Sequence, residues 1–465
     1  MSSIKSELIP SENEMFEWTT AIFNQGIRRP GYPADYKTEL LIKNQFKALG
    51  LEKITLDPIK VKKWEVFGAH LKIWPIGKPN KAIEIPCFPI PYTKSTKNLE
   101  GELTLIKDKT PISKKIGVAF FGLFKFPLNV IPLIPGLDRY RYYDPENQFD
   151  ELEQLVPLNF QLRNILDSKI LKDALGFIGI LSGYPWDTDK FYFPYDAVER
   201  NLPGVYVSAK NGKKISELMK KGTIRANISS RTKISEVISH NITGSLQGNS
   251  EEWIIIGSHH DGPWNSAVED ASGMTLVLAQ AKYWSQLPPN QRPFNMLFLM
   301  NCAHMAGAKG AIKFVEKNKD LLEKTITAIH LEHIARDVKI EEEKLIPLNE
   351  PTPRWWFVSR IAELEDIVEN AIKKEDLKRS IIFPPENFPP GSDKPPTDGC
   401  FYHTKAIPLI SFLTAPPYLF DPDDTLDKVH KESYIPLTRA IIHIINELKK
   451  YNAKKLRALV LDKKD

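Results

Sequence analysis

Cysteine is scarce in this chain of 465 residues. Its three cysteines, Cys87, Cys302 and Cys400, are far apart and odd in number. They provide neither the dense framework of a small disulfide-stabilised protein nor a C-x-x-C zinc knuckle. Such sparse cysteine is typical of a reducing compartment, so the sequence predicts a cytoplasmic protein.

Long apolar runs are also absent. A membrane-spanning helix needs about 20 apolar residues, and the longest candidate, residues 118–137, is broken by Lys125 and three prolines. The first residues, MSSIKSELIPSENEMFEW, lack the apolar core of a signal peptide. We therefore expect no membrane partner.

No charge of one sign dominates. The formal charge is +5 at pH 7, and no basic cluster is interleaved with aromatic residues, so we expect no nucleic-acid partner. The hydrophobic fraction of 42% and the charged fraction of 26% are those of an ordinary folded protein. The length exceeds that of one typical core, which predicts a large domain with an insertion or a second domain.

The pattern of apolar and polar residues changes twice along the chain. Helical patterns over residues 13–50 and strand-like patterns over 51–75 predict that residues 1–75 begin the main domain. Short β-like runs then alternate with loops rich in proline and tyrosine, so residues 76–235 are predicted to be a β-rich insertion. Residues 236–465 are predicted to complete the main domain.

Short apolar runs alternate with helical patterns in this last segment. The predicted strands are residues 253–257, 295–300, 327–333 and 406–413, and the predicted helices are 271–284, 306–318 and 431–451. The alternation predicts an α/β fold, a doubly wound mixed sheet flanked by helices. Ligands bind such sheets beyond the carboxyl ends of the strands.

Histidine and acidic residues fall at those strand ends. His259, His260 and Asp261 follow the first strand, His304 follows the second, and Glu332 ends the third. A single His-x-Asp motif is often a solvated loop, but repetition on successive strand ends favours a metal site. Imidazoles with carboxylates suit zinc, and the carboxylate of Asp261 would orient an imidazole ligand.

The same residues lie in motifs that resemble a known family. The chain resembles the zinc aminopeptidases that include aminopeptidase Y and glutamate carboxypeptidase, in the form with an inserted protease-associated domain. The resemblance rests on GSHHD (257–261), SAVEDASG (266–273), AHMAGAKG (303–310), HLE (330–332), TDGCFYHTKAIP (397–408) and FDPDDT (420–425).

The resemblance implies half of a two-metal site. In the family two zinc ions share a bridging aspartate, and this position is Glu269 here. The first ion would also take His259 and Glu332, whereas the second loses its ligands to Met305 and Phe420. We therefore expect one divalent metal ion, zinc in the first instance.

The residue at the family's general-base position is His304. Three interpretations follow. The first is a single-metal hydrolase of an amide or peptide-like bond, with His304 as general base or as a fourth ligand. The second is a catalytically inactive relative that binds peptides or a partner, and the third is a metal-free structural cluster.

Further residues are expected around the ion. Asp270 caps the next helix, or is the ligand if the motif is shifted by one residue, and His260, His333 and Asp398 contact the ligands or the substrate. The substrate pocket is predicted at Trp264, Met305, Tyr418 and Phe420. The substrate would be a small amide or peptide. The sequence leaves open whether the protein forms a homo-oligomer.

Overall fold

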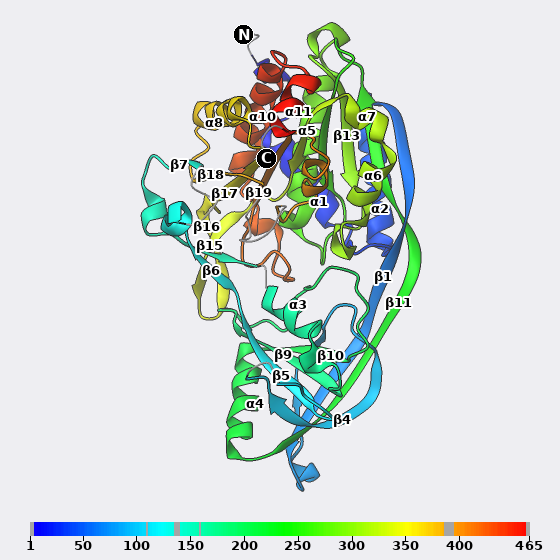
Figure 1. Ribbon diagram of the computed structural model, residues 1–465, viewed down its shortest axis with the longest axis vertical. Coiled ribbons are helices and arrows are strands. Elements are labelled where there is room, and N and C mark those ends of the chain that lie inside the picture. The colour runs from blue at the N-terminus through cyan, green and yellow to red at the C-terminus, as the bar shows by residue number, and fades with distance from the viewer. Residues whose placement is uncertain (1–3, 108–109, 134–139, 158–159, 386–394, 462–465) are drawn as a thin grey trace.

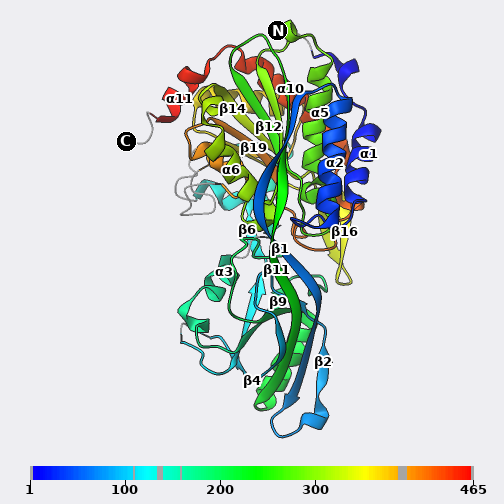
Figure 2. The ribbon, with the colours of Figure 1, turned by 90° about the vertical axis from the view of Figure 1, so that its right-hand side faces the viewer.

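The computed structural model describes residues 4–107, 110–133, 140–157, 160–385 and 395–461. It has two lobes stacked along the long axis of the molecule, and two long antiparallel strands run through both (Figures 1 and 2). These strands are β1 (Glu52–Pro75) and β11 (Ile224–Leu246).

The larger lobe contains the predicted mixed sheet. Its strands lie in the order β11-β13-β12-β14-β19-β17-β18-β7. The new members are β12 (Trp253–His259), β13 (Asn295–Asn301), β14 (Thr325–Leu331), β19 (Leu409–Thr414), β17 (Arg354–Val358), β18 (Ser380–Phe383) and β7 (Arg141–Tyr143). β12 pairs in parallel with β13 and β14, and β14 pairs in parallel with β19.

Helices cover both faces of this sheet (Figure 2). The first face is covered by α1 (Glu12–Phe23), α2 (Pro33–Ala48), α5 (Gly273–Ser285), α8 (Ala362–Lys374) and α10 (Tyr434–Leu448). The other face carries α6 (Lys309–Lys317), α7 (Lys319–Glu323), α9 (Cys400–His403) and α11 (Ala453–Leu461). This architecture confirms the predicted α/β class.

Local sequence signals explain where several helices begin. The Ser11 side chain accepts a hydrogen bond from the Glu14 amide at the start of α1, and Pro33 occupies the first turn of α2. α2 is followed by Gly50 with φ of +75°, a conformation that favours glycine at a helix end. β12 has the apolar sequence WIIIG of a strand covered on both faces.

The smaller lobe is built on the far halves of β1 and β11. It contains β2 (Ile83–Ile85), β3 (Phe88–Pro89), β4 (Thr96–Leu105), β5 (Ile116–Gly122), β9 (Gly176–Gly183), β10 (Gly204–Ser208) and α4 (Ala209–Lys221). β11 pairs with β4 near its start and with β13 near its end, so one strand belongs to both lobes.

Residues 76–235 therefore do not lie in one lobe. β6 (Phe124–Pro127) and β8 (Glu153–Val156) form a two-stranded antiparallel sheet, and α3 (Phe160–Leu166) follows β8 in the chain. β7 from the same segment pairs with β18 at the edge of the main sheet. Part of the segment that was predicted to be a β-rich insertion thus completes the larger lobe.

The predicted strands and helices of residues 253–451 are present. The sequence analysis did not find β17 and β18, nor the hairpin of β15 (Arg336–Glu341) and β16 (Lys344–Pro351). No helix among the described residues is long and apolar enough to cross a membrane. Residues 134–137, at the end of the longest apolar run, lie outside the described residues.

Candidate metal centre

The candidate site lies at the carboxyl ends of β12, β13 and β14. His259 is the last residue of β12, His304 follows β13, and Glu332 and His333 follow β14. Glu269 reaches the same place from an irregular loop in front of α5, where its φ and ψ are −95° and 90°. The parallel order of the strands brings these side chains to one edge of the sheet.

Three of these side chains direct metal-binding atoms to one place. One atom each from His259, Glu269 and His333 lies within 4.8 Å of the other two. His333 Nε2 is 2.6 Å from Glu269 Oε2, and His259 Nε2 is 3.3 Å from Glu269 Oε1. All three residues are buried, yet no described residue completes an aligned hydrogen bond to these four atoms. Buried polar atoms normally have a partner, so this trio fits a divalent cation.

A second trio shares His259. Ligand atoms of His259, His304 and Glu332 also lie within 4.8 Å of one another. Glu332 Oε1 already accepts hydrogen bonds from His330 Nε2 at 2.8 Å and from Thr397 Oγ1 at 3.1 Å. The expected ligands His259, Glu269 and Glu332 are thus spread over two overlapping trios, and His333 joins Glu269 more closely than the sequence indicated.

His304 has a carboxylate partner and an aromatic neighbour on each side. Its Nδ1 lies 2.7 Å from Asp398 Oδ1. The ring stacks on that of His259, with centroids 4.1 Å apart and planes 8° apart, and on that of Tyr195, with centroids 5.3 Å apart. Asp398 therefore pairs with His304 beside the two trios.

The buried charges of the site shift one another's pKa values. Burial alone would raise the pKa of Glu269, but the imidazoles of His333 and His259 hold it far below its ordinary value. Burial would lower the pKa of His333, whereas the carboxylate of Glu269 raises it to about 10. Burial also raises the pKa of Asp270 to about 6. The carboxylates create a negative potential that favours the binding of cations, whether these are protons or a metal ion.

The carboxylate of Asp261 accepts hydrogen bonds from backbone amides. Its two carboxylate oxygens accept the amides of His304 at 3.0 Å and Met305 at 2.7 Å. The contact to His259 Nδ1 comes from the carbonyl oxygen of Asp261 at 3.0 Å, while the carboxylate is 3.8 Å away. Asp261 thus orients His259 through its main chain and fixes the turn that carries His304, without facing the cluster of ligand atoms.

Asp270 and His260 also point to other partners. Asp270 accepts hydrogen bonds from the Ser258 hydroxyl and, at 3.0 Å, from the His333 amide, and so ties two strand ends together. His260 turns away from the site: its Nε2 contacts the His240 carbonyl at 2.9 Å and its Nδ1 lies 3.1 Å from Asp35 Oδ1.

The expected pocket residues divide into two groups. Phe420 packs 5.1 Å from the ring of Tyr195, beside His304, and Trp264 donates to the Phe420 carbonyl at 2.9 Å. Met305 is fully buried, and its carbonyl accepts a hydrogen bond from the Tyr192 hydroxyl at 3.3 Å. Tyr418 instead donates its hydroxyl to the Arg336 carbonyl at 2.9 Å, so its polar end serves a loop rather than a substrate.

Two residues at the site were missed in the sequence. His330 lies two positions before Glu332 on β14, and the two-residue period of a strand places both side chains on one face; this signal was available. Tyr195 comes from the loop between β9 and β10 in the smaller lobe. No local pattern near Tyr195 indicates that the loop reaches His304.

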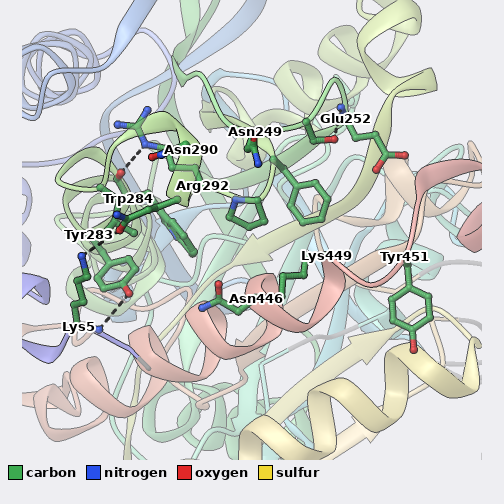
Figure 3. Close-up of a pocket in the computed structure, with 15 residues that line it drawn as sticks. Lys5, Asn249, Glu252, Tyr283, Trp284, Asn290, Arg292, Asn446, Lys449 and Tyr451 are labelled. Carbon is green, nitrogen blue, oxygen red and sulfur yellow. Dashed lines mark hydrogen bonds between the residues drawn. The ribbon is translucent and has the colours of Figure 1, made fainter. Parts of the chain in front are cut away.

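A separate cavity of about 560 Å³ lies near the amino ends of β12 and β13 (Figure 3). It is lined by Lys5, Tyr283, Arg292 and Asn446, among others. The guanidinium of Arg292 donates to the carbonyls of Trp284, Gln247 and Ser285, which gives it a structural role. The cavity is at the opposite edge of the sheet and contains none of the residues of the metal centre.

The fold and the site can be compared with known proteins. Peptidase family M28 matches residues 241–445, and no curated protein matches the sequence. A solved peptidase M28 precursor from Shewanella amazonensis is 15% identical, covers 94% of this chain and 92% of its own, and has a TM-score of 0.69.

Two aminopeptidases have a similar fold. An aminopeptidase from Aneurinibacillus sp. strain AM-1 is 17% identical with a TM-score of 0.61, covering 94% of this chain and 93% of its own. BSAP, a zinc aminopeptidase from Bacillus subtilis, is 13% identical with a TM-score of 0.63, covering 93% and 95%. The family match leaves out residues 76–235, so a protease-associated domain stays a prediction. Residues 241–445 thus match peptidase family M28, and the chain shares its fold with solved aminopeptidases, one of them a zinc aminopeptidase.

Proposed function

We propose that the protein hydrolyses amide or peptide bonds with a single divalent ion held by His259, Glu269 and His333. The observation that carries the proposal is that one ligand atom each from His259, Glu269 and His333, all three buried, lies within 4.8 Å of the other two. Two imidazoles and a carboxylate are a common zinc set, which leaves a coordination position open. When bound, such an ion supplies Lewis-acid polarisation of a carbonyl and activation of water.

The chemistry of His259 supports one ion rather than two. Its Nδ1 is engaged by the Asp261 carbonyl at 3.0 Å, which leaves only Nε2 as a ligand atom. Both trios need that one nitrogen. In addition, the positions that hold the second ion in the resembled family are Met305 and Phe420, neither of which offers a hard ligand.

We assign His304 the role of proton acceptor rather than ligand. Because an imidazole lone pair lies in the ring plane, one ion cannot lie in the planes of two parallel stacked rings such as His259 and His304. Donation from Nδ1 to Asp398 leaves Nε2 to take a proton.

The aromatic wall suggests the substrate class. Tyr195 stacks on His304, and Phe420 packs against Tyr195. An apolar side chain or acyl group next to the cleaved bond would lie against these rings. We therefore propose a small amide or a peptide with an apolar group at that position.

Elemental analysis of the purified protein tests the metal centre. We expect about one zinc ion per chain in the wild type and in the control His443→Ala, whose imidazole pairs with Glu375 far from the site. Glu269→Gln and His333→Ala should lose the ion, whereas Glu332→Ala should keep it. Two ions per chain would contradict the single-ion proposal.

An absence of metal from the wild type would favour a peptide-binding relative or a structural cluster. One ion per chain without cleavage of any aminoacyl, N-acyl or peptide chromogenic substrate would favour the inactive relative. Loss of the ion in Glu332→Ala together with retention in His333→Ala would restore the ligand set expected from the sequence.

A further inference from the structure

A fully buried arginine from the beginning of the chain contacts the loop that carries Glu269. Arg28 donates from Nε to the His260 carbonyl at 3.2 Å, and from Nη2 to the carbonyls of Ser266 at 2.9 Å and Glu269 at 3.2 Å. Its Nη1 donates to the Asn265 carbonyl. One side chain thus satisfies four main-chain oxygens around a single loop.

The main chain of the same segment is attached to this loop as well. The Arg28 amide donates to the Trp264 carbonyl at 3.2 Å, and the Gly262 amide donates to the Arg28 carbonyl at 3.2 Å. In sequence, Gly262 and Trp264 lie between His260 and Asn265, whose carbonyls accept from the guanidinium. Residues more than 230 positions apart are therefore joined by both main-chain and side-chain hydrogen bonds.

Asp424 holds the other side of the loop. Its carboxylate accepts the amides of Val268 at 2.7 Å and Glu269 at 2.9 Å. Carbonyl oxygens of the loop are thus bound by Arg28 and amide groups by Asp424. Both side chains are buried, and both bind the main chain of the residue that bears the proposed ligand.

The loop needs such partners because it forms no regular structure. Ser266 has φ of +46°, and Glu269 and Asp270 have non-helical backbone angles. Buried carbonyls and amides outside helices and sheets must find hydrogen bonds elsewhere. The Glu269 carboxylate lies 2.6 Å from His333 Nε2 and 3.3 Å from His259 Nε2, and the main chain of the loop sets the place from which it reaches both imidazoles.

We propose that Arg28 is a positioning residue of the metal centre, which fixes the loop of residues 262–269 so that Glu269 meets His259 and His333. The inference rests on the proposed metal site and adds the part of the chain that shapes it. Arg28 acts through Glu269 and contacts no ligand atom.

The test compares Arg28→Lys with Arg292→Lys. A lysine keeps the charge but cannot donate in the four directions of the guanidinium. Arg292 is a matched control because its buried guanidinium also donates to several carbonyls, those of Trp284, Gln247 and Ser285, but at the opposite edge of the sheet. Zinc affinity is measured by competition with a chelating dye, and hydrogen exchange is measured at the amides of Val268 and Glu269.

We expect Arg28→Lys to bind zinc about 10- to 100-fold more weakly, the usual effect of losing a partner that orients a ligand. Its two loop amides should exchange faster than in Arg292→Lys, while both variants keep the wild-type secondary structure. Equal zinc affinity and equal exchange in the two variants would overturn the proposal and leave the metal site standing.

A wild type that binds no zinc would instead refute the proposed function. The hydrogen exchange would then decide alone whether Arg28 fixes the loop. If Arg28→Lys does not fold, Asp424→Asn provides the second variant. The asparagine side chain has a single oxygen to accept the two backbone amides that the Asp424 carboxylate binds with two. Wild-type zinc affinity and exchange in Asp424→Asn would show that the loop needs no side-chain support, contrary to the proposal.

Discussion

Among single residues, His304 shows how neighbours can determine a chemical role. A glutamate at this position would have acted as a base without help, whereas an imidazole needs one nitrogen fixed and the other exposed to the reaction. The 2.7 Å contact of Nδ1 with Asp398 provides the first condition. Stacking on His259 and Tyr195 holds the ring plane and so provides the second.

Substitution of His304 should separate catalysis from metal binding. We expect His304→Gln to lower kcat about 10²- to 10⁴-fold, the usual contribution of a general base, and to keep one zinc ion per chain. Asp398→Asn should lower kcat less, because the imidazole remains. Steady-state kinetics and elemental analysis measure the two effects, with His443→Gln as the control. Loss of zinc in His304→Gln would identify this residue as a ligand.

A buried histidine outside the site should make stability depend on pH. Burial, with a further contribution from the charge of Arg354, lowers the pKa of His430 to about 4. The unfolded chain takes up this proton near pH 6.5. The free energy of unfolding should therefore fall as pH drops from 6.5 towards 4, by up to about 1.4 kcal/mol per pH unit from this group.

Urea unfolding between pH 7.5 and 4.5 tests this dependence. His430→Gln should show a flatter profile than the wild type, whereas a glutamine at the exposed His70 should leave the wild-type slope unchanged. Parallel profiles for the wild type and His430→Gln would contradict the assignment, whatever the difference in stability at neutral pH.

Some site residues followed from the sequence and others could not. His259, Glu269 and His304 were found because each lies just after a predicted strand or just before a predicted helix. His333 was expected beside the ligands, because it follows Glu332 in the sequence. In the structure β14 ends at Leu331, and His333 has φ of +31°, which turns its imidazole to Glu269. Local periodicity does not predict such a backbone conformation.

Among the elements, the predictions were best where a strand is apolar on both faces. β12, β13 and β14 are such strands, and the amphipathic pattern of α10 is equally plain. β1 was harder to recognise as one strand, since its 24 residues alternate lysine and glutamate with apolar residues over an exposed ribbon. Its length is set by pairing with β11, which is distant in sequence.

The packing of α6 on β13 can be tested at Gly310. A Cβ atom there would lie 2.3 Å from the Cys302 carbonyl oxygen and 2.4 Å from Asn241 Oδ1. We expect Gly310→Ala to destabilise the protein by about 1–3 kcal/mol through overpacking and to displace the turn of His304. Lys313→Ala, exposed on the same helix, should have little effect. Unfolding midpoints of both variants measure the difference, and equal midpoints would contradict the close packing.

At the scale of the whole molecule, the two lobes share strands that a segment-by-segment interpretation assigns to separate domains. β7 and β18 are about 240 residues apart in sequence and still pair. Such pairing depends on contacts that no local composition encodes. The α/β class could be predicted because it follows from alternation along the chain, whereas the division of residues 76–235 between the lobes could not.

The long ladder between β1 and β11 has a consequence for how such a molecule can change in evolution. Its register runs from Glu52 opposite Ser245 to Pro75 opposite Ile224, with irregularities only near residues 52–55 and 66–68. One added residue in either strand would reverse the faces of every side chain beyond it. The position of Tyr195 in one lobe relative to His304 in the other thus depends on the number of residues in these two strands. New substrate preferences would arise more readily from a moved bulge in the ribbon than from a longer loop.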